Sequence, residues 1–569
     1  MNTYKTVIRL VATVLIVGTG PLWGEVKMPA IFGDHMVLQQ DSTLPVWGTA
    51  EPGEKVTVTV GTDTGSAVAD NDGKWMVKLT PLPAGTAQQI MTVTGKNTLK
   101  FEDILVGDIW ICSGQSNMAF GLGGAHNAAT ELPKANDPQL RLFAVGLKVS
   151  VKPLTDVGGK WVVCTPDTAK GFTAVGYFFG RDLRAHLNRP IGLIGTYWGG
   201  TPAQAWTSLE ALQKDPLMKH YVEAHDKIMA GNTPEALKAF YTKYAAYQTE
   251  KTKWETEVNT PFKASIVAWN EAVTKAKTDG QAPPPKPTLS QPAPYAPVPP
   301  DGGQGAPANL FNAMIAPLIP YAIKGAIWYQ GESNAGQPVE YRSLFADMIK
   351  DWRERWGQGD FPFLFVQLAR YKTPNNAFAE VRQAQLQTLA LPNTGMATAF
   401  DVGNQDDIHP KDKMDVGQRL ALVARHVAYG ENLVYTGPLF DKVEVTGDKV
   451  RVSFTELGGG LVIGTAPWVP EGATPLPTTS LLGFTLLAPD GKWVDADAII
   501  DGNTVVVSSP QIPKPYAVRY AFDNATGNLY NKEGLPAIPF RSDKGAEAWG
   551  QPKAAPVLAP VPTTPPATK

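Results

Sequence analysis

Two polar turns far apart in the sequence hold side chains that together could cleave an ester. The first turn is Gly114-Gln115-Ser116-Asn117, which directly follows the apolar run 108–112. A sharp turn between a strand and a helix can expose a serine hydroxyl at the carboxyl end of the strand, as in a nucleophile elbow. Ser and Asn are also favoured helix N-caps, so this turn alone fits either role equally well. A nucleophilic serine needs a base, because its free hydroxyl stays protonated at neutral pH.

Seven histidines could supply that base, and their surroundings narrow the choice to His409. The other six lie in an expected β-domain, in helical patterns, in an inserted segment or in a Gly-rich loop: His35, His126, His186, His220, His225 and His426. His409 lies in the polar loop 401–410 after the expected strand 394–400, at the edge of a sheet where α/β sites form. Asp406 or Asp407 could hold its imidazole in the tautomer that accepts the serine proton.

A metal site is the competing interpretation of that loop. Two carboxylates and one histidine are plausible metal ligands. The chain offers no second cluster of histidines or cysteines that would support zinc. We therefore expect a serine mechanism and no metal.

Two further turns could stabilise the negative charge that forms when a serine attacks an ester. One follows the expected strand 191–196 and contains Gly199-Gly200, whose backbone amides could approach a substrate closely. The other follows the expected strand 324–329 and offers Gln330 as a side-chain donor, with Glu332 as a bracing group. Each turn is a weak signal alone, but polar turns at several strand ends of one sheet are a much stronger one.

The pattern between residues 107 and 432 explains how these turns could meet. Apolar strands alternate there with amphipathic helices, which is typical of a parallel sheet covered on both faces. The clearest helix precedes residue 361 and carries one apolar stripe that we expect in the core: Tyr341, Leu344, Phe345, Met348, Ile349 and Trp352. Residues 208–306 interrupt the alternation, and their composition predicts a helical insertion that ends in an extended Pro-rich linker.

The flanking segments predict two β-domains and two segments outside the folded body. Residues 25–106 and 433–550 show period-two alternation between turns, which is typical of antiparallel strands. Residues 1–24 resemble a secretory signal peptide, because basic residues precede an apolar core too short to span a bilayer. Residues 551–569 are rich in Pro, Ala and Thr and are expected to be disordered. These features predict a secreted or periplasmic protein.

Composition excludes some classes of partner. The formal net charge is −2, from 51 basic and 53 acidic residues, so we expect neither nucleic acid nor a membrane surface as partner. A chain of 569 residues should form several domains. Its two cysteines, Cys112 and Cys164, could close a disulfide that braces the turn at Ser116, or could remain buried thiols.

Six motifs occur in one order along the chain: Gly-Gln-Ser-Asn-Met at 114–118, Trp-Gly-Gly-Thr-Pro at 198–202, Trp-Tyr-Gln-Gly-Glu-Ser-Asn at 328–334, Asp-Ile-His-Pro at 407–410, Asn-Leu-Tyr-Asn at 528–531 and Gly-Leu-Pro at 534–536. Together they resemble the sialate O-acetylesterases, a branch of the SGNH (GDSL-like) hydrolases. The resemblance covers nearly all of the chain except the signal, the insertion and the tail.

The resemblance implies an α/β fold, namely an SGNH-type three-layer α/β/α sandwich with a parallel sheet, flanked by an N-terminal β-sandwich and a C-terminal β-domain. It implies no cofactor, and it assigns Ser116 as the nucleophile and His409 as the base. It also implies the oxyanion donors: the Ser116 amide, Gly199, Gly200 and the Gln330 side chain. The superfamily spacing Asp-x-x-His points to Asp406, whereas the family form Asp-Ile-His points to Asp407, which we prefer.

These observations predict a secreted serine esterase that removes O-acetyl groups from carbohydrates. The sugar could be O-acetylated sialic acid or an acetylated plant polysaccharide such as xylan or xyloglucan. Sialate recognition needs a cation for the carboxylate, and Arg370 and Arg382 are candidates.

We expect the sugar to contact Trp198, Tyr329 and Glu332. Core packing is nevertheless the more usual role for aromatic residues such as Trp198, Trp206 and Tyr329. Two other classes stay open. One is a non-catalytic carbohydrate-binding protein with a relic esterase domain, and the other is a lipase or peptidase. The Ser116 and His409 pair argues against the first, and the lack of an extended apolar entrance motif argues against the second.

Overall fold

The computed structural model describes residues 25–373, 376–469, 476–522 and 526–543. The predictions of a signal peptide over 1–24 and of a disordered tail over 551–569 lie outside these residues. Within the described ranges, none of the helices combines the length and the apolar character needed to cross a bilayer.

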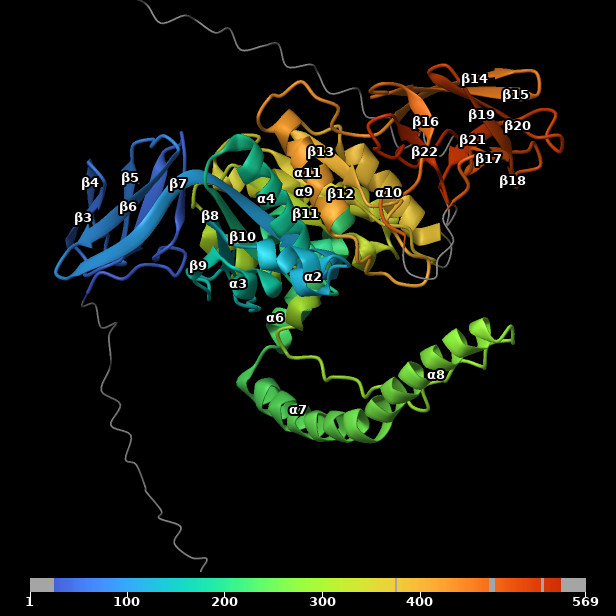
Figure 1. Cartoon of the computed structure of the whole chain (residues 1–569). Coiled ribbons are helices and arrows are strands. Elements are labelled where there is room, and N and C mark those ends of the chain that lie inside the picture. The colour runs from blue at the N-terminus through green and yellow to red at the C-terminus, as the bar shows by residue number, and fades with distance from the viewer. Residues whose placement is uncertain (1–24, 374–375, 470–475, 523–525, 544–569) are drawn as a thin grey trace, which may run out of the picture.

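A seven-stranded path of one mixed sheet forms the centre of the molecule (Figure 1). Its order is β13 (Thr394–Thr398), β12 (Phe363–Gln367), β11 (Gly325–Tyr329), β7 (Thr98–Gly114), β10 (Ile191–Tyr197), β8 (Asp137–Ala144) and β9 (Trp161–Cys164). The pairs from β13 to β8 are parallel, and β9 joins β8 antiparallel. The parallel strands are almost entirely buried because helices lie on both faces.

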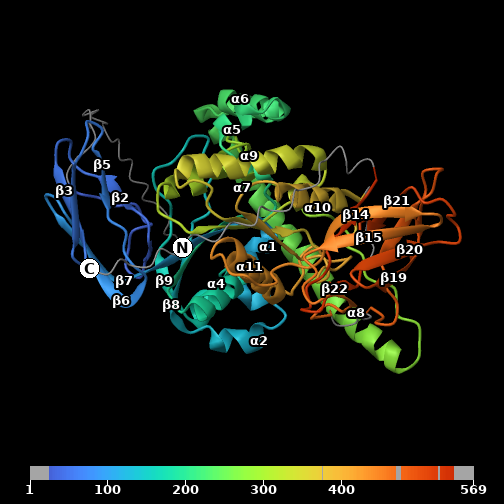
Figure 2. The ribbon, with the colours of Figure 1, turned by 90° about the horizontal axis from the view of Figure 1, so that it is seen from above.

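Two pairs of helices cover this sheet (Figure 2). On one side, α4 (Ala174–Leu187) packs against α11 (Met414–Val427), and on the other α9 (Pro338–Trp356) packs against α10 (Ala377–Thr388). The predicted apolar stripe of α9 is confirmed, since all six of its side chains are buried.

Strand β7 belongs both to the central sheet and to the N-terminal β-region. That region comprises β1 (Val37–Gln39), β2 (Leu44–Thr49), β3 (Lys55–Val60), β4 (Asp63–Val68), β5 (Lys74–Leu79) and β6 (Gly85–Thr94). The first half of β7 pairs antiparallel with β6, and its second half pairs in parallel with β10 and β11. Residues 98–103 alternate between exposed and half-buried positions, whereas residues 104–114 are all buried. The domain boundary predicted between residues 106 and 107 therefore falls inside one continuous strand.

The C-terminal region is built from short antiparallel strands around a core of its own. One sheet has the order β14 (Leu439–Thr446), β15 (Lys449–Thr455), β20 (Thr504–Ser508), β19 (Asp497–Asp501), and another has the order β18 (Trp493–Asp495), β17 (Phe484–Leu487), β21 (Ala517–Tyr520), β23 (Phe540–Arg541). A further pair joins β16 (Leu461–Ile463) to β22 (Leu529–Asn531).

The interrupting segment forms a bent helical arm that extends away from the body (Figure 1). It contains α5 (Leu209–Lys214), α6 (Lys219–Gly231), α7 (Pro234–Trp254) and α8 (Thr260–Thr278). None of the side chains of α7 is buried. Residues 281–299 then return to the body without forming a helix or a strand.

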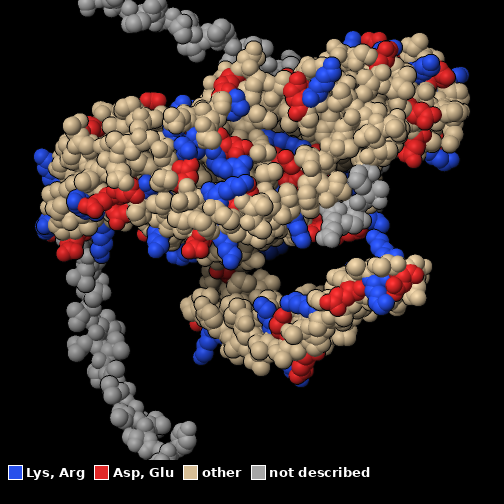
Figure 3. Space-filling view, in the orientation of Figure 1, with Lys and Arg blue, Asp and Glu red and all other residues tan. Residues whose placement is uncertain are grey.

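Acidic and basic side chains are interspersed over the face of the molecule shown in Figure 3. This mixed surface agrees with the nearly balanced charge of the whole chain, −2.

Candidate active site

Three parallel strands place the catalytic candidates at one edge of the sheet. Gly114 at the end of β7 aligns with Tyr197 at the end of β10 and with Tyr329 at the end of β11. Gly114 has a φ of 138°, and a Cβ there would lie 2.2 Å from the Tyr329 carbonyl oxygen. Only glycine fits this turn, which begins the short helix α1 (Ser116–Ala119).

The structure brings Ser116 and His409 into direct contact. Ser116 Oγ lies 2.8 Å from His409 Nε2, although the two residues are 293 positions apart. His409 reaches the serine from the loop after β13, at the same edge of the sheet. With the proton on Nδ1, Nε2 accepts the hydrogen bond of the hydroxyl and can take its proton.

The surroundings of His409 favour its neutral form. Burial lowers the pKa of His409 below its ordinary value, the nearby Lys413 ammonium lowers it further, and the Asp407 carboxylate opposes both. A base must be unprotonated to act, so a lowered pKa keeps His409 functional in more acidic solution.

We expect the acidic limb of the pH profile of kcat/KM for p-nitrophenyl acetate to have its midpoint below pH 6.5, which is about the ordinary pKa of histidine. Activity is present above the His409 pKa and is lost as the pH falls through it. Lys413→Met removes a positive charge and should move the limb to higher pH, measured on variants that keep the wild-type circular dichroism. A limb that stays in place would show that the Lys413 charge does not act on His409.

Neither aspartate makes a hydrogen bond to the ring of His409. Asp407 Oδ1 lies 4.0 Å from His409 Nδ1 and instead accepts the His409 backbone N–H at 2.9 Å. The side chains of His409 and Asp407 are 39% and 46% exposed, so water screens their attraction. The Asp406 carboxylate acts on Arg370 instead. Burial lowers the pKa of Arg370, and the negative charge of Asp406 partly opposes that shift. Asp407 is thus the nearer of the two aspartates to the imidazole, and its hydrogen bond is to the backbone of the loop.

Asp407→Asn should lower kcat/KM for p-nitrophenyl acetate by less than about tenfold, whereas loss of a buried, hydrogen-bonded triad aspartate costs about 10⁴-fold. The reason is the 4.0 Å separation together with the exposure of both side chains. Asp406→Asn serves as the matched control. A loss above a hundredfold for Asp407→Asn alone would mean that this carboxylate closes onto Nδ1 during the reaction.

Asn117 joins the serine turn to the histidine loop, a role that sequence reasoning missed. Its Nδ2 donates to Glu332 Oε1 at 2.6 Å and to the Ile408 carbonyl at 3.0 Å, and its Oδ1 accepts from Lys413 Nζ at 2.5 Å. Asn117 and Lys413 are buried. The position of Asn117 beside Ser116 was the only signal in the sequence, and nothing there marked Lys413. We call Asn117, Glu332 and Lys413 the buried clamp.

The buried clamp contains two charged groups removed from water. Burial lowers the pKa of Lys413 to about 7, although Glu332, Asp407 and Asp412 all favour its charged form. Burial also raises the pKa of Glu332, while Asn117 and Lys413 oppose that shift. The Lys413 ammonium lies 4.9 Å from the Phe120 ring centre and 5.3 Å from that of Tyr329. These contacts hold both catalytic turns against one fixed cluster.

Backbone amides near Ser116 are available for an oxyanion. A Cβ on Gly199 would lie 3.4 Å from Ser116 Cβ, so glycine lets this backbone come close to the nucleophile. Gly200, the next residue, has a φ of 73°. The backbone N–H groups of Ser116, Gly199 and Gly200 make no hydrogen bond within the described part of the chain.

Gln330 does not present a free donor. Its Nε2 donates to Asn334 Oδ1 at 2.7 Å and to the Thr201 carbonyl at 3.3 Å, which occupies both amide hydrogens. The side chain is fully buried. The expectation of direct oxyanion contact is therefore not met, because Gln330 instead braces the turn that contains Gly199 and Gly200.

Two of the three expected sugar contacts are also not met. Tyr329 is fully buried at the end of β11, and Glu332 directs its carboxyl group into the buried clamp. Trp206 is core as well, and its indole N–H donates to Thr201 Oγ1. Trp198 is only partly buried, although it packs against the core.

The disulfide between Cys112 and Cys164 is not formed, since both residues are buried free thiols. Cys112 lies in β7 and Cys164 in β9, with β10 and β8 between them in the sheet. Three strand spacings amount to about 14 Å, well beyond the reach of a disulfide. Among the described residues, no group of three or more His, Cys, Asp or Glu side chains is arranged to hold a metal ion.

This chain is similar in sequence to known carbohydrate esterases. The family model described as carbohydrate esterase, sialic acid-specific acetylesterase, matches residues 106–259 and 306–425. The sialate O-acetylesterase of Rattus norvegicus is 32% identical over 472 residues, covering 75% of this chain and 78% of that protein. The sialate O-acetylesterase of Homo sapiens is 30% identical over 471 residues, covering 75% and 76%.

A solved structure is also similar. The crystal structure of a carbohydrate acetylesterase from Xanthomonas citri has a TM-score of 0.71 and 34% identity, covering 91% of this chain and 100% of that one. The family match omits residues 260–305, which hold α8 and the segment after it. The enzymes that share this chain's sequence over most of their length are carbohydrate O-acetylesterases, and the chain belongs to the sialate O-acetylesterase family of carbohydrate esterases.

Proposed function

We propose that this esterase removes O-acetyl groups from sugars through an acetyl-enzyme on Ser116, with His409 as the base and Asp407 as a weak orienting group. The observation that carries this proposal is the 2.8 Å contact between Ser116 Oγ and His409 Nε2 at the carboxyl edge of the sheet. A serine beside a neutral imidazole is the arrangement that nucleophilic acyl transfer requires.

The reaction proceeds in two halves. Ser116 Oγ attacks the acetyl carbonyl carbon while His409 Nε2 takes the hydroxyl proton. The protonated imidazole then gives that proton to the departing sugar oxygen, which leaves acetate esterified to Ser116. Water, deprotonated by His409, attacks this ester, and acetate leaves as Ser116 regains its proton.

The negative oxygen of each tetrahedral intermediate lies among the backbone amides of Ser116, Gly199 and Gly200. Their freedom from other hydrogen bonds supports this role. Two or three preoriented donors of this kind typically supply a large part of the rate enhancement. Gln330 contributes by fixing the turn through the Thr201 carbonyl.

The catalytic part, residues 107–432, is an SGNH-type three-layer α/β/α sandwich carrying β-domains at 25–106 and 433–550. The parallel order β13-β12-β11-β7-β10-β8, with helices on both faces, supports this assignment. The segment 1–24 directs the protein out of the cytoplasm, to the periplasm or the medium. The substrate is O-acetylated sialic acid or an acetylated polysaccharide such as xylan or xyloglucan.

The test is labelling with a fluorophosphonate probe, combined with acetate release from acetylated sialic acid, xylan and xyloglucan. We expect mass spectrometry to find the probe on the peptide that contains Ser116, and acetate release to stop in proportion to labelling. Long-chain p-nitrophenyl palmitate should not be cleaved. Sugar binding without acetate release would instead support the non-catalytic alternative, and labelling at another residue would contradict the serine assignment.

A further inference from the structure

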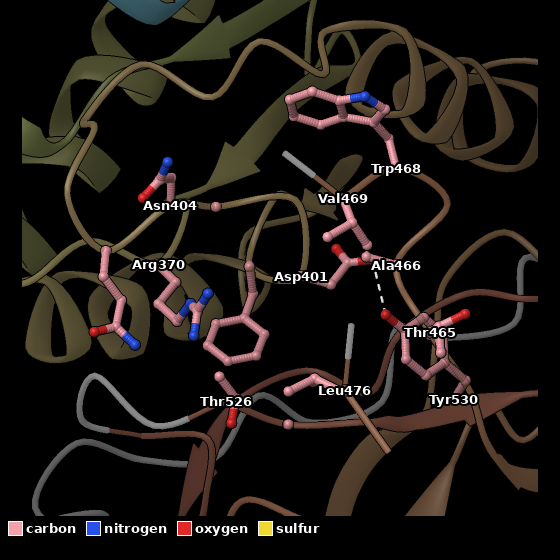
Figure 4. A pocket seen from close by; sticks show the side chains of 14 residues that line it. Arg370, Asp401, Asn404, Thr465, Ala466, Trp468, Val469, Leu476, Thr526 and Tyr530 are labelled. Atoms are coloured by element: carbon pink, nitrogen blue, oxygen red, sulfur yellow. Dashed lines mark hydrogen bonds between the residues drawn. The ribbon is translucent and has the colours of Figure 1, made fainter. Parts of the chain in front are cut away.

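A cavity of about 290 Å³ lies where the catalytic part meets the C-terminal β-region (Figure 4). Arg370, Asn404 and Gln405 line it from the loops after β12 and β13. Trp468 and Tyr530 line it from the C-terminal region. A concave site with aromatic walls and a few polar groups is the usual form of a small-ligand pocket.

This cavity is separate from Ser116, but two of its lining residues lie in the loop that carries His409. Asn404 and Gln405 belong to the same loop as His409. The cavity lies at the end of β13, three strand spacings from β7, or about 14 Å across the sheet. A single sugar whose acetyl group sits at Ser116 does not extend that far, whereas an oligosaccharide can reach both places.

The Trp468 ring provides an aromatic wall held in a fixed orientation. It stacks on His126, with ring centres 4.6 Å apart and ring planes 17° apart. His126 in turn is tied to the loop after His409, because its backbone N–H donates to the Lys411 carbonyl. Such a rigid, amphipathic surface is well suited to the face of a sugar ring.

Arg370 gives the cavity a positive charge that is not paired with any described carboxylate. Its guanidinium makes no hydrogen bond or ion pair with the residues that the structure describes, and burial lowers its pKa against the distant effect of Asp406. Asp401, the acidic residue lining the cavity, is already neutralised by two contacts to Arg419 of 2.6 and 2.7 Å. A half-buried guanidinium of this kind favours a carboxylate, which it can bind through two parallel hydrogen bonds. The other candidate arginine, Arg382, is buried and donates to the Phe522 carbonyl.

We infer that this cavity is a second carbohydrate subsite that binds a sugar unit bearing a carboxylate, so that the enzyme acts on acetyl groups of acidic oligosaccharides. The inference rests on the proposed function. The carboxylate could belong to a uronic acid or to a sialic acid, since both present the same group to Arg370.

The experiment compares kcat/KM on three acetylated substrates: a xylo-oligosaccharide with a glucuronic acid branch, the same oligosaccharide without the branch, and a sialylated oligosaccharide. Each value is divided by kcat/KM for p-nitrophenyl acetate, which is too small to reach the cavity. We expect the wild type to prefer at least one acidic oligosaccharide over the neutral one, and the preferred substrate identifies the source of the carboxylate.

Arg370→Gln should lower that ratio by about 10- to 100-fold for the preferred acidic substrate, the usual value of a charge-assisted hydrogen-bond pair, and much less for the neutral one. The ratio for Arg370→Lys should lie between those of the wild type and Arg370→Gln, because an ammonium cannot form a bidentate pair of hydrogen bonds with a carboxylate. Trp468→Ala should lower the ratio for acidic and neutral oligosaccharides alike. Arg451→Gln, at an exposed arginine of β15 paired with Asp501, is the matched control and should leave the ratio unchanged.

Two results would overturn the inference while leaving the proposed function intact. One is a wild-type enzyme that cleaves acidic and neutral oligosaccharides equally well. The other is an unchanged ratio in Arg370→Gln, with melting temperatures confirming that the variant is folded. A wild-type enzyme that releases no acetate from any ester would overturn the proposed function itself.

Discussion

Replacing Ser116 with alanine is expected to lower kcat/KM for p-nitrophenyl acetate by about 10⁴-fold or more. The substitution removes the attacking oxygen that lies 2.8 Å from His409 Nε2, and leaves the amides and the histidine in place. Residual hydrolysis would come from water activated by His409 in the same site. The fold should persist, because Ser116 belongs to a one-turn helix at the sheet edge and is not part of the core.

Initial rates of p-nitrophenol release, measured at several substrate concentrations, provide the test. Ser333→Ala is the matched control, since Ser333 is an exposed serine on the neighbouring turn after β11. It should retain wild-type activity. If Ser116→Ala kept more than a tenth of the activity, the acetyl-enzyme mechanism would be wrong.

Asn117→Ala is expected to lower kcat by about 10²-fold and to lower the free energy of unfolding by about 3 kcal/mol. The side chain is the common partner of Glu332, Lys413 and the Ile408 carbonyl. Its loss leaves a buried carboxyl group and a buried ammonium without the hydrogen bonds that they share through Asn117, which accounts for the expected fall in the free energy of unfolding. It also releases the loop that holds His409 beside Ser116, which accounts for the expected fall in kcat.

Urea unfolding and steady-state kinetics separate these two effects. A positioning role requires kcat to fall while KM for p-nitrophenyl acetate changes little, and the acidic limb of the pH profile should shift as His409 moves relative to Lys413. Asn503→Ala, in an exposed turn of the C-terminal sheet, controls for a general effect of losing an asparagine. Lower stability with unchanged kcat would show that the buried clamp is purely structural.

The parallel strands and the Ser116 and His409 contact could be predicted because both leave local traces. Buried parallel strands are nearly continuous apolar runs, so the expected strands 191–196 and 324–329 correspond to β10 and β11 within one residue. The turns that follow such strands meet at one edge whatever the length of chain between them. That rule linked Ser116 to His409 without any knowledge of the intervening residues.

The roles of Lys413, Gln330 and the two cysteines depend on residues far away in the sequence, so no local sequence pattern indicated them. Lys413 is buried through a contact with Asn117, 296 positions away, and its own neighbours in sequence suggest an ordinary exposed lysine. Gln330 has the chemistry of an oxyanion donor, yet Asn334 and Thr201 occupy its amide hydrogens. The pairing of Cys112 with Cys164 was plausible by count alone, and only the strand order shows that they are too far apart.

The domain boundary expected between residues 106 and 107 falls inside β7. Composition changes there because the surroundings of β7 change, from a half-exposed sheet to the buried centre, while the strand itself continues. A change of pattern along the sequence therefore marks a change of environment, and it marks a domain boundary only where the backbone also ends its pairing.

The continuity of β7 also bears on how this enzyme can be shortened. Ser116, the proposed nucleophile, follows this strand by two residues, and the opposite end of the same strand is hydrogen-bonded to β6 in the N-terminal region. An expressed fragment that starts at residue 107 would begin in the middle of a strand. Residues 108–114 would keep their pairing with β10 and β11, but they would lose the hydrogen bonds that the side chains of Gln39 and Gln40 make to Asp108 and to the Ile109 N–H. We therefore expect a catalytic fragment to fold stably only when it also contains the N-terminal β-region.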